Sequence, residues 1–273
     1  MKAGIDCGTS RIKAAWRDAG GMHRFFSSSD VCEVADRLKK EGVTKLRVTG
    51  IGGRVPEGFD VVGPADDPIA DEIALQSEGA RRLLAAQGGP DAGFLLVSVG
   101  TGTSYTLVPD RGDPRRFPLG NAIGGGFIAG LAAWQAVDRS AIDGFASRGR
   151  PRDVLIKDLV PAKDGTLEGE FVVSHFGKDE VMGACVIPEG GRPLDDYCAT
   201  IVHCAAVTVI RDVMLIGMIE GFAAEDVVFI GTPVAKMTAL VGHLSRYAAA
   251  LGKRAHFPEN GEYAAALGAL YAP

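Results

Sequence analysis

The sequence contains one local pattern twice: a short apolar strand, a turn built from glycine and threonine, and a second apolar strand. The first copy spans residues 2–17 and the second spans residues 94–108, and their turns begin at Gly8 and Gly100. Backbone N–H groups in such turns can point together at an anion, because glycine places no side chain in the way. The repetition predicts two hairpins in two related halves that face each other, and it leaves internal duplication of the sequence open.

Elsewhere the apolar residues recur with strand or helix spacing. Further strands are expected at residues 45–50 and 226–230, and helices at 30–42, 69–87, 121–137, 140–150, 195–217, 234–251 and 263–270. Asp30 is the expected N-cap of the first helix, and Gly42 its expected end. Residues 154–177 show no clear periodicity. Strands that alternate with helices predict an α/β protein.

The composition indicates a globular chain with many special backbone positions. Glycine accounts for 37 of the 273 residues, whereas proline, at 14, is not in excess, and this argues against a disordered or collagen-like chain. The net charge of −5 supplies no broad basic surface. We therefore expect neither nucleic acid nor an anionic membrane as a partner.

The cysteines and the apolar runs predict a cytoplasmic protein. The five cysteines are widely spaced and form no CxxC pair, which is typical of a reduced compartment. The first ten residues hold no apolar stretch of signal-peptide length. The longest apolar run, residues 201–219, is interrupted by His203, Arg211 and Asp212. We expect it to form a buried helix rather than a membrane span.

Two common nucleotide-binding motifs are excluded. No GxxxxGK[ST] segment occurs, which excludes the common P-loop. Gly100 and Gly102 match the start of a GxGxxG motif, but Tyr105 stands where the third glycine is needed. A strand is expected after this turn, whereas the dinucleotide-binding motif requires a helix there. A nicotinamide-dependent enzyme is therefore not expected.

The order of strand, Asp-x-Gly-Thr/Ser turn and strand resembles the first phosphate loop of the actin, sugar-kinase and Hsp70 superfamily. Residues 6–10 with Lys13 match that loop, residues 99–104 match the second phosphate loop, and residues 231–233 match the adenosine-side loop. The resemblance implies a two-lobed actin-like ATPase (ribonuclease H-like) fold with a nucleotide cleft between the lobes. The lobes are expected at residues 1–92 and 93–273.

A closer resemblance, from Met1 to Tyr271, is to the type II pantothenate kinases. The segments that carry it are residues 4–13, 71–72, 79–80, 99–104, 120, 124–126, 174–177, 259–261 and 266–270. It implies ATP-dependent phosphorylation of pantothenate to 4′-phosphopantothenate, the first step of coenzyme A biosynthesis, with Mg²⁺ as a cofactor. It also implies a homodimer, with an apolar interface from the helix at residues 195–217, and an acyl-CoA feedback ligand.

The resemblance implies roles for individual residues. Glu72 would be the catalytic base that takes the proton of the acceptor hydroxyl, and Asp6 would hold Mg²⁺, through water. The ATP- and phosphate-binding residues would be Asp6, Gly8, Thr9, Ser10, Lys13, Gly100, Thr101, Gly102, Thr103, Gly125 and Gly231. The acceptor-binding residues would be Arg116, Gly120 and Asn121.

Each of these roles has a structural alternative. Glu72 lies among other charged residues of a predicted helix, where it is also consistent with a solvated surface charge. Asp6 is also consistent with a cap of its own turn, and Lys13 with a strand residue that faces solvent. The glycines at residues 124–126 are consistent with helix packing as well as with close approach to a ligand.

The sequence departs from the pantothenate kinase pattern in two places. The first loop of that family usually reads Asp-x-Gly-Gly-Thr, whereas here Thr9 follows Gly8 directly. The arginine by which the family contacts pantothenate aligns with Phe117. Arg115 or Arg116 would replace it only if this segment shifts its register. The second departure bears on the acceptor more than on the phosphate donor, because a carboxylate acceptor usually takes a guanidinium partner.

Two other functions therefore stay open at this point. One is a kinase of the same superfamily with a different hydroxyl acceptor, such as an amino sugar or a small hydroxy acid. The other is a nucleotide-dependent regulatory ATPase, like the ATPases that activate radical dehydratases. Those activators hold an iron–sulfur cluster with closely spaced cysteines, and the cysteines of this chain are far apart in the sequence.

Overall fold

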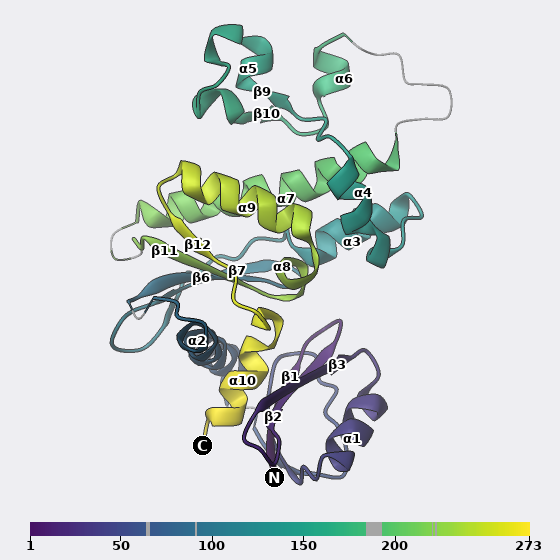
Figure 1. Cartoon of the computed structure of the whole chain (residues 1–273), viewed down its shortest axis with the longest axis vertical. Helices are drawn as coiled ribbons and strands as arrows, with labels where there is room; N and C mark the ends of the chain where they lie inside the picture. The colour runs from purple at the N-terminus through teal and green to yellow at the C-terminus, as the bar shows by residue number, and fades with distance from the viewer. Residues whose placement is uncertain (64–65, 91, 184–192, 220, 222) are drawn as a thin grey trace.

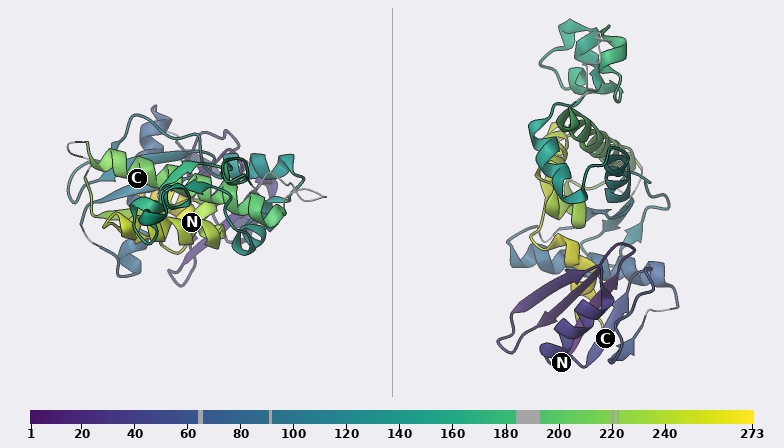
Figure 2. Two further views of the ribbon diagram at one scale, coloured as in Figure 1. Left: turned by 90° about the horizontal axis from the view of Figure 1, so that it is seen from above. Right: turned by 90° about the vertical axis from the view of Figure 1, so that its right-hand side faces the viewer.

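The computed structural model describes residues 1–63, 66–90, 92–183, 193–219, 221 and 223–273. Cys185 lies outside these residues. The molecule is elongated and consists of two five-stranded sheets, one above the other along the long axis, with a small unit at the far end (Figures 1 and 2).

The first sheet has the strand order β3-β2-β1-β4-β5. Its strands are β1 (Lys2–Cys7), β2 (Ile12–Arg17), β3 (His23–Ser28), β4 (Lys45–Thr49) and β5 (Asp60–Val62). The central strand β1 pairs antiparallel with β2 and parallel with β4. Helix α1 (Val31–Lys40) follows β3, and Asp30 caps it by accepting a hydrogen bond from the backbone of Cys32 at 2.8 Å. This confirms the predicted N-cap.

The second sheet has the order β12-β11-β6-β7-β8. Its strands are β6 (Phe94–Val99), β7 (Thr103–Val108), β8 (Arg115–Arg116), β11 (Asp226–Ile230) and β12 (Arg254–His256). Its central strand β6 pairs antiparallel with β7 and parallel with β11, as β1 does with its own neighbours. The repeated sequence pattern is therefore part of a repeated sheet topology.

Two helices form a layer between the sheets: α2 (Pro68–Ala86) and α10 (Ala264–Tyr271) (Figure 1). They approach closely because glycines lie at the contact. A Cβ atom on Gly79 would lie 1.8 Å from the carbonyl oxygen of Ala264, and one on Gly4 of β1 would lie 1.9 Å from that of Ala266. The predicted division at residue 92 separates the two sheets, but α10, which it assigns to the second lobe, packs against β1, β2 and β4 of the first sheet.

The outer face of the second sheet is covered by helices α3 (Gly125–Trp134), α4 (Ile142–Arg148), α7 (Leu194–Gly217), α8 (Thr232–Lys236) and α9 (Thr238–Ala250). Helix α7 is long and apolar enough to cross a membrane by length and composition, but 67% of its most apolar stretch is buried in the protein. It packs against α3, α4 and α9. The prediction of a buried core helix is confirmed.

The small unit at the top of Figure 1 is formed by residues 150–183. It contains β9 (Val154–Leu155), α5 (Ile156–Leu159), β10 (Val172–Ser174) and α6 (Lys178–Val181), with 3-10 turns at Pro161–Lys163 and Glu168–Glu170. Two further 3-10 turns lie elsewhere, at Arg139–Ala141 and Gly261–Tyr263. Buried Asp153 ties the unit to α7, because its carboxylate contacts His203, whose other ring nitrogen lies 2.6 Å from the hydroxyl of Tyr247 on α9.

Candidate active site

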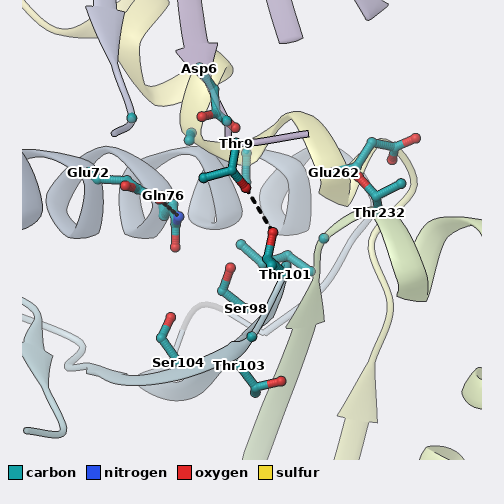
Figure 3. Close-up of a pocket in the computed structure, with 18 of the residues that line it drawn as sticks. Asp6, Thr9, Glu72, Gln76, Ser98, Thr101, Thr103, Ser104, Thr232 and Glu262 are labelled. Atoms are coloured by element: carbon teal, nitrogen blue, oxygen red, sulfur yellow. Dashed lines mark hydrogen bonds between the residues drawn. The ribbon is translucent and has the colours of Figure 1, made fainter. Parts of the chain in front are cut away.

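A cavity of about 450 Å³ lies where the β1–β2 and β6–β7 turns and helix α2 meet (Figure 3). It is lined by nearly all of the residues for which the sequence suggested a role. These are Asp6, Gly8, Thr9, Ser10, Lys13, Glu72, Gly100, Thr101, Gly102, Thr103, Arg116, Gly120, Asn121 and Gly231. Gly125 is the exception. The structure therefore gathers in one place residues from both ends and the middle of the chain.

The first hairpin contributes an ion pair. Asp6, only 6% exposed, lies directly opposite Lys13 in the β1–β2 register, and Lys13 Nζ donates to its Oδ2 at 3.2 Å. Lys13 faces the cavity, so the alternative of a solvent-facing lysine is wrong. Gly50 adopts a φ of +88°, and a Cβ there would lie 2.8 Å from Asp6 Oδ1. Glycine at this position therefore leaves room for the carboxylate.

The turn of this hairpin is held from behind by the segment after β4. The backbone N–H of Gly52 donates to the carbonyl of Cys7 at 2.7 Å, and Arg54 Nη2 donates to the carbonyl of Thr9 at 3.2 Å. Because these bonds use the carbonyl groups of the turn, its N–H groups stay available to an anion.

The second hairpin contributes glycines and hydroxyl groups. The N–H of Gly100 donates to the carbonyl of Gly102 at 2.8 Å, which closes the turn. Gly125 does not line the cavity; its N–H donates to the carbonyl of Gly100 at 2.8 Å, and that of Gly126 to Thr101 at 2.9 Å. A Cβ on Gly124 would lie 2.7 Å from the Gly102 oxygen. The glycine triplet thus serves close packing under the loop.

The two turns touch each other across the cavity. The hydroxyl oxygens of Thr9 and Thr101 lie 2.9 Å apart, within hydrogen-bond distance (Figure 3). Gly231 closes the same region from β11: its φ is +110°, and a Cβ there would lie 2.0 Å from the carbonyl oxygen of Val99. The ends of β1, β6 and β11 therefore converge on one edge of the cavity.

Glu72 reaches the cavity from α2. Burial raises the pKa of its carboxyl group, and the negative charge of Asp6 raises this pKa further. The positive charges of Lys13 and Arg116, and a hydrogen bond from Gln76, act in the opposite direction. The alternative of a solvated helix charge is wrong for Glu72. A carboxylate with a raised pKa beside two glycine turns is suited to act as a general base.

Strand β8 brings one arginine to the cavity. Arg116 lines the cavity, whereas Arg115 donates to the backbone carbonyl of Gly221 on the other side of the strand. Phe117 packs against the apolar core of the second half. The register of this segment thus places the guanidinium of Arg116, the residue before Phe117, in the cavity.

Asn121 is held in a hydrogen-bonded network. Its backbone pairs with Thr103 in both directions at 2.8 Å, and its side-chain amide donates to Asp212 of α7 at 2.6 Å. Tyr105 donates to the same carboxylate oxygen at 2.9 Å. These bonds connect the loop at Asn121 to the second hairpin and to α7.

Several residues that line the cavity were missed by the sequence analysis, among them Arg11, Gln76, Ser98, Arg139 and Glu262. Two of them carry a recognisable signal. Gln76 follows Glu72 by one helical turn, and Ser98 occupies in β6 the position of Asp6 in β1. Within the described ranges no group of three or more His, Cys, Asp or Glu side chains is arranged as a metal site. Asp6 offers a carboxylate at the β1–β2 turn, which fits Mg²⁺, an ion commonly held by one or two carboxylates plus substrate phosphates.

No family model matches the chain. A type II pantothenate kinase from Staphylococcus aureus (strain USA300) is 27% identical over 281 residues, covering 99% of both chains. Two solved structures show the same fold. One is an activator of 2-hydroxyisocaproyl-CoA dehydratase from Clostridium difficile with bound ADPNP (TM-score 0.66, 19% identity, 99% and 93% of the two chains). The other is a ROK family glucokinase from Streptomyces griseus with glucose and AMPPNP (TM-score 0.54, 12% identity, 98% and 97%).

The likeness to these structures confirms the predicted fold. At 19% and 12% sequence identity, it shows the fold alone. The likeness to the pantothenate kinase covers the full length of both chains. The protein is therefore an actin-like ATPase fold protein and a distant, full-length homologue of the type II pantothenate kinases.

Proposed function

We propose that this protein is an ATP-dependent kinase that converts pantothenate to 4′-phosphopantothenate, the first step of coenzyme A biosynthesis, in the cytoplasm. One observation carries the proposal: the Glu72 carboxyl group, the Asp6–Lys13 pair and the Arg116 guanidinium line the same cavity between two glycine turns. An acceptor that carries a hydroxyl and a carboxylate needs a base for the hydroxyl proton and a cation for the carboxylate. The phosphate donor needs backbone N–H groups and a cation for its phosphate oxygens.

The two turns would bind the phosphate groups of ATP. Backbone N–H groups of Gly8 to Ser10 and of Thr101 and Gly102 would donate to phosphate oxygens, and Lys13 would add a positive charge. Mg²⁺, when bound through Asp6 and the phosphates, neutralises charge on the transferred group. Since the transition state of phosphoryl transfer is loose, most of the acceleration comes from such positioning and charge neutralisation.

Glu72 would act on the acceptor. It takes the proton of the primary hydroxyl while the hydroxyl oxygen forms a bond to the γ-phosphorus of ATP. The bond from that phosphorus to the β,γ-bridging oxygen breaks, and its electron pair leaves with ADP. The raised pKa of Glu72 suits this role, because a carboxylate with a higher proton affinity accepts the proton more readily.

Arg116 would hold the carboxylate of the acceptor. Guanidinium groups pair with carboxylates through two parallel hydrogen bonds, which fixes orientation as well as affinity. From β8, Arg116 would make the contact with pantothenate that the pantothenate kinases make through the arginine aligned with Phe117. Gly120 and the backbone of Asn121 line the same part of the cavity.

We further propose a homodimer formed by the unit of residues 150–183. Helix α7, for which the sequence suggested an interface, already has its apolar side in the core of its own protomer. The unit instead exposes many large apolar side chains: Leu159, Val160, Leu167, Phe171, Val173, Phe176, Val181 and Met182. So many exposed apolar side chains in one small unit are typical of protein interfaces. Light scattering at micromolar concentration that finds a monomer would contradict the dimer.

The experiment that tests the function is an assay of ATP-dependent phosphorylation with Mg²⁺. Pantothenate is compared with a panel of hydroxyl acceptors, including amino sugars and small hydroxy acids, and the product is identified by mass. We expect pantothenate to give the highest kcat/KM and Arg116→Leu to raise KM for pantothenate much more than KM for ATP. Preference for an uncharged acceptor would contradict the proposal.

A further inference from the structure

Gln76 is a residue of α2 to which neither the sequence motifs nor the related proteins give a role. Its Nε2 donates to Oε1 of Glu72 at 2.7 Å. Both side chains line the cavity, and Figure 3 shows them side by side on the helix. Residues four apart on a helix share one face. The helix itself therefore sets the distance between the amide and the carboxylate.

We propose that Gln76 is a positioning residue for the base of the proposed kinase reaction: it engages one oxygen of Glu72 and leaves the other to take the proton of the acceptor hydroxyl. This rests on the function proposed above. Within the described residues, Gln76 makes the one side-chain hydrogen bond to Glu72, so Oε2 stays available. A carboxylate that can rotate freely presents either oxygen in many orientations, and a fixed one presents a single oxygen to the acceptor.

The charges around Glu72 give the amide a second effect. Burial and the nearby carboxylate of Asp6 both raise the pKa of Glu72, and a group that stays protonated cannot act as a base. The Gln76 amide donates to the charged form and so lowers this pKa. Gln76 would thus favour the ionised form of Glu72, which is the form that can accept a proton.

A neutral donor suits this position better than a charged one. Lysine or arginine at residue 76 would attract the acceptor carboxylate or the phosphates and compete with Arg116 and Lys13 for them. A glutamate there would add a third carboxylate to the pair Asp6 and Glu72. The amide stabilises the base without changing the net charge of the cavity.

The test uses Gln76→Met, which keeps the size and removes the donor, and Gln76→Glu, which keeps the shape and reverses the interaction. Gln87→Met is the matched control, because Gln87 ends the same helix, hydrogen-bonds the backbone of Glu259 and lies outside the cavity. Two quantities are measured: the pH profile of kcat/KM with ATP and pantothenate, and the titration of the Glu72 carboxyl carbon by ¹³C NMR in the free protein. The Glu72 signal is assigned by its absence in Glu72→Gln.

We expect the pKa of Glu72 to rise in Gln76→Met and further in Gln76→Glu, with no change in Gln87→Met. The acidic limb of the kcat/KM profile should move to higher pH by the same amount, and activity should recover above it. A merely structural role predicts a uniform loss of activity without movement of the limb.

Three results separate the inference from the proposed function. An unmoved Glu72 titration in both Gln76 variants overturns the inference, whatever the activity. A moved titration with an unmoved acidic limb overturns it as well. A moved titration in a protein that phosphorylates no pantothenate supports the coupling of the two side chains and contradicts the proposed function instead.

Discussion

The β1–β2 and β6–β7 hairpins occupy equivalent positions in their sheets, and they differ at the residues nearest the cavity. Asp6 pairs with Lys13 in the first hairpin, whereas Ser98 pairs with Ser104 at the corresponding register of the second. The turn of the second is one residue shorter, because Val99 pairs with Thr103 where Cys7 pairs with Ile12. One hairpin thus brings a carboxylate and an ammonium group to the cavity, and the other brings hydroxyl groups.

This difference suggests how a repeated scaffold can bind an asymmetric ligand. A chain of phosphates with one metal ion needs charged side chains at one place and neutral N–H donors along the rest. If both hairpins carried an Asp–Lys pair, two carboxylates would face the same phosphates and repel them. The first hairpin is therefore expected to depend on its side chains, and the second mainly on its backbone.

The largest expected effect comes from removing the charge of the first hairpin. Asp6→Asn leaves Lys13 without its ion-pair partner and removes the carboxylate available to Mg²⁺. ATP turnover should fall about 10³-fold, in the range seen when one electrostatic partner of a transition state is lost. The matched change in the second hairpin, Ser98→Ala, should alter turnover by less than about threefold. Equal losses in steady-state kinetics would break the comparison.

The backbone of the second hairpin is tested by Gly102→Ala. The new Cβ would lie 2.8 Å from the carbonyl oxygen of Asn121, a backbone atom that has no rotamer to move into. The loop must shift, and KM for ATP should rise about tenfold or more. Gly130→Ala in α3 is the control, since a Cβ there meets nothing within 4 Å. An unchanged KM in Gly102→Ala would show that the loop backbone does not position the phosphates.

A third test moves from the hairpins to the histidines of the second half, through the pH dependence of stability. The carboxylate of Asp153, 3.1 Å from Nδ1 of His175, raises the pKa of His175 to about 9, and the thiol of Cys204 contributes to the shift. This stabilisation is complete below the unfolded-state pKa of 6.5 and is lost as the pH rises through 9. Burial lowers the pKa of His243 to about 4, so stability should also fall as the pH drops from 6.5 through 4.

The melting temperature measured from pH 4 to pH 10 by circular dichroism checks both limbs. His175→Gln should lose the alkaline limb and keep the acidic one, because His243 is unchanged in this variant. An alkaline limb that persists in His175→Gln would show that another group causes it.

The smallest expected effect concerns the contact between the hairpins. The hydroxyl pair of Thr9 and Thr101 is exposed to solvent, so its contribution to folding is about 0.5–1 kcal/mol. Thr9→Val and Thr101→Val should each lower the free energy of unfolding by this amount, and the double variant should lower it no further. Additive losses in urea unfolding would mean that the two hydroxyl groups do not interact in solution.

The hairpins could be predicted from the sequence because their signals are local. A turn that starts with glycine between two apolar strands depends on neighbouring residues only. Among the strands of the two main sheets, the four that the sequence did not predict, β3, β5, β8 and β12, all lie at sheet edges. Strands β5, β8 and β12 have only two or three residues, and the two apolar residues of β3 are adjacent, so none of the four shows the apolar alternation that identifies a strand.

The position of Glu72 and Arg116 could not be predicted from local patterns. Glu72 enters the cavity because α2 packs on α10, a contact between segments far apart in the sequence that depends on Gly79 and Gly268. Arg116 enters it because β8 pairs with β7 at two positions, and so short a strand leaves its register open in the sequence. The same limit explains why Gly125 was placed among the ATP-binding residues although it does not line the cavity. A glycine that contacts a ligand and a glycine that supports a loop from below look identical in a sequence.

The packing of α10 on the first sheet has a consequence for how the protein is made. Strand β1 is synthesised before α10, the helix of residues 264–271 that covers Gly4. Until those residues leave the ribosome, one apolar face of the first sheet has no cover from α10. The first half therefore cannot finish folding before the second, and incomplete chains should present that face to chaperones or proteases.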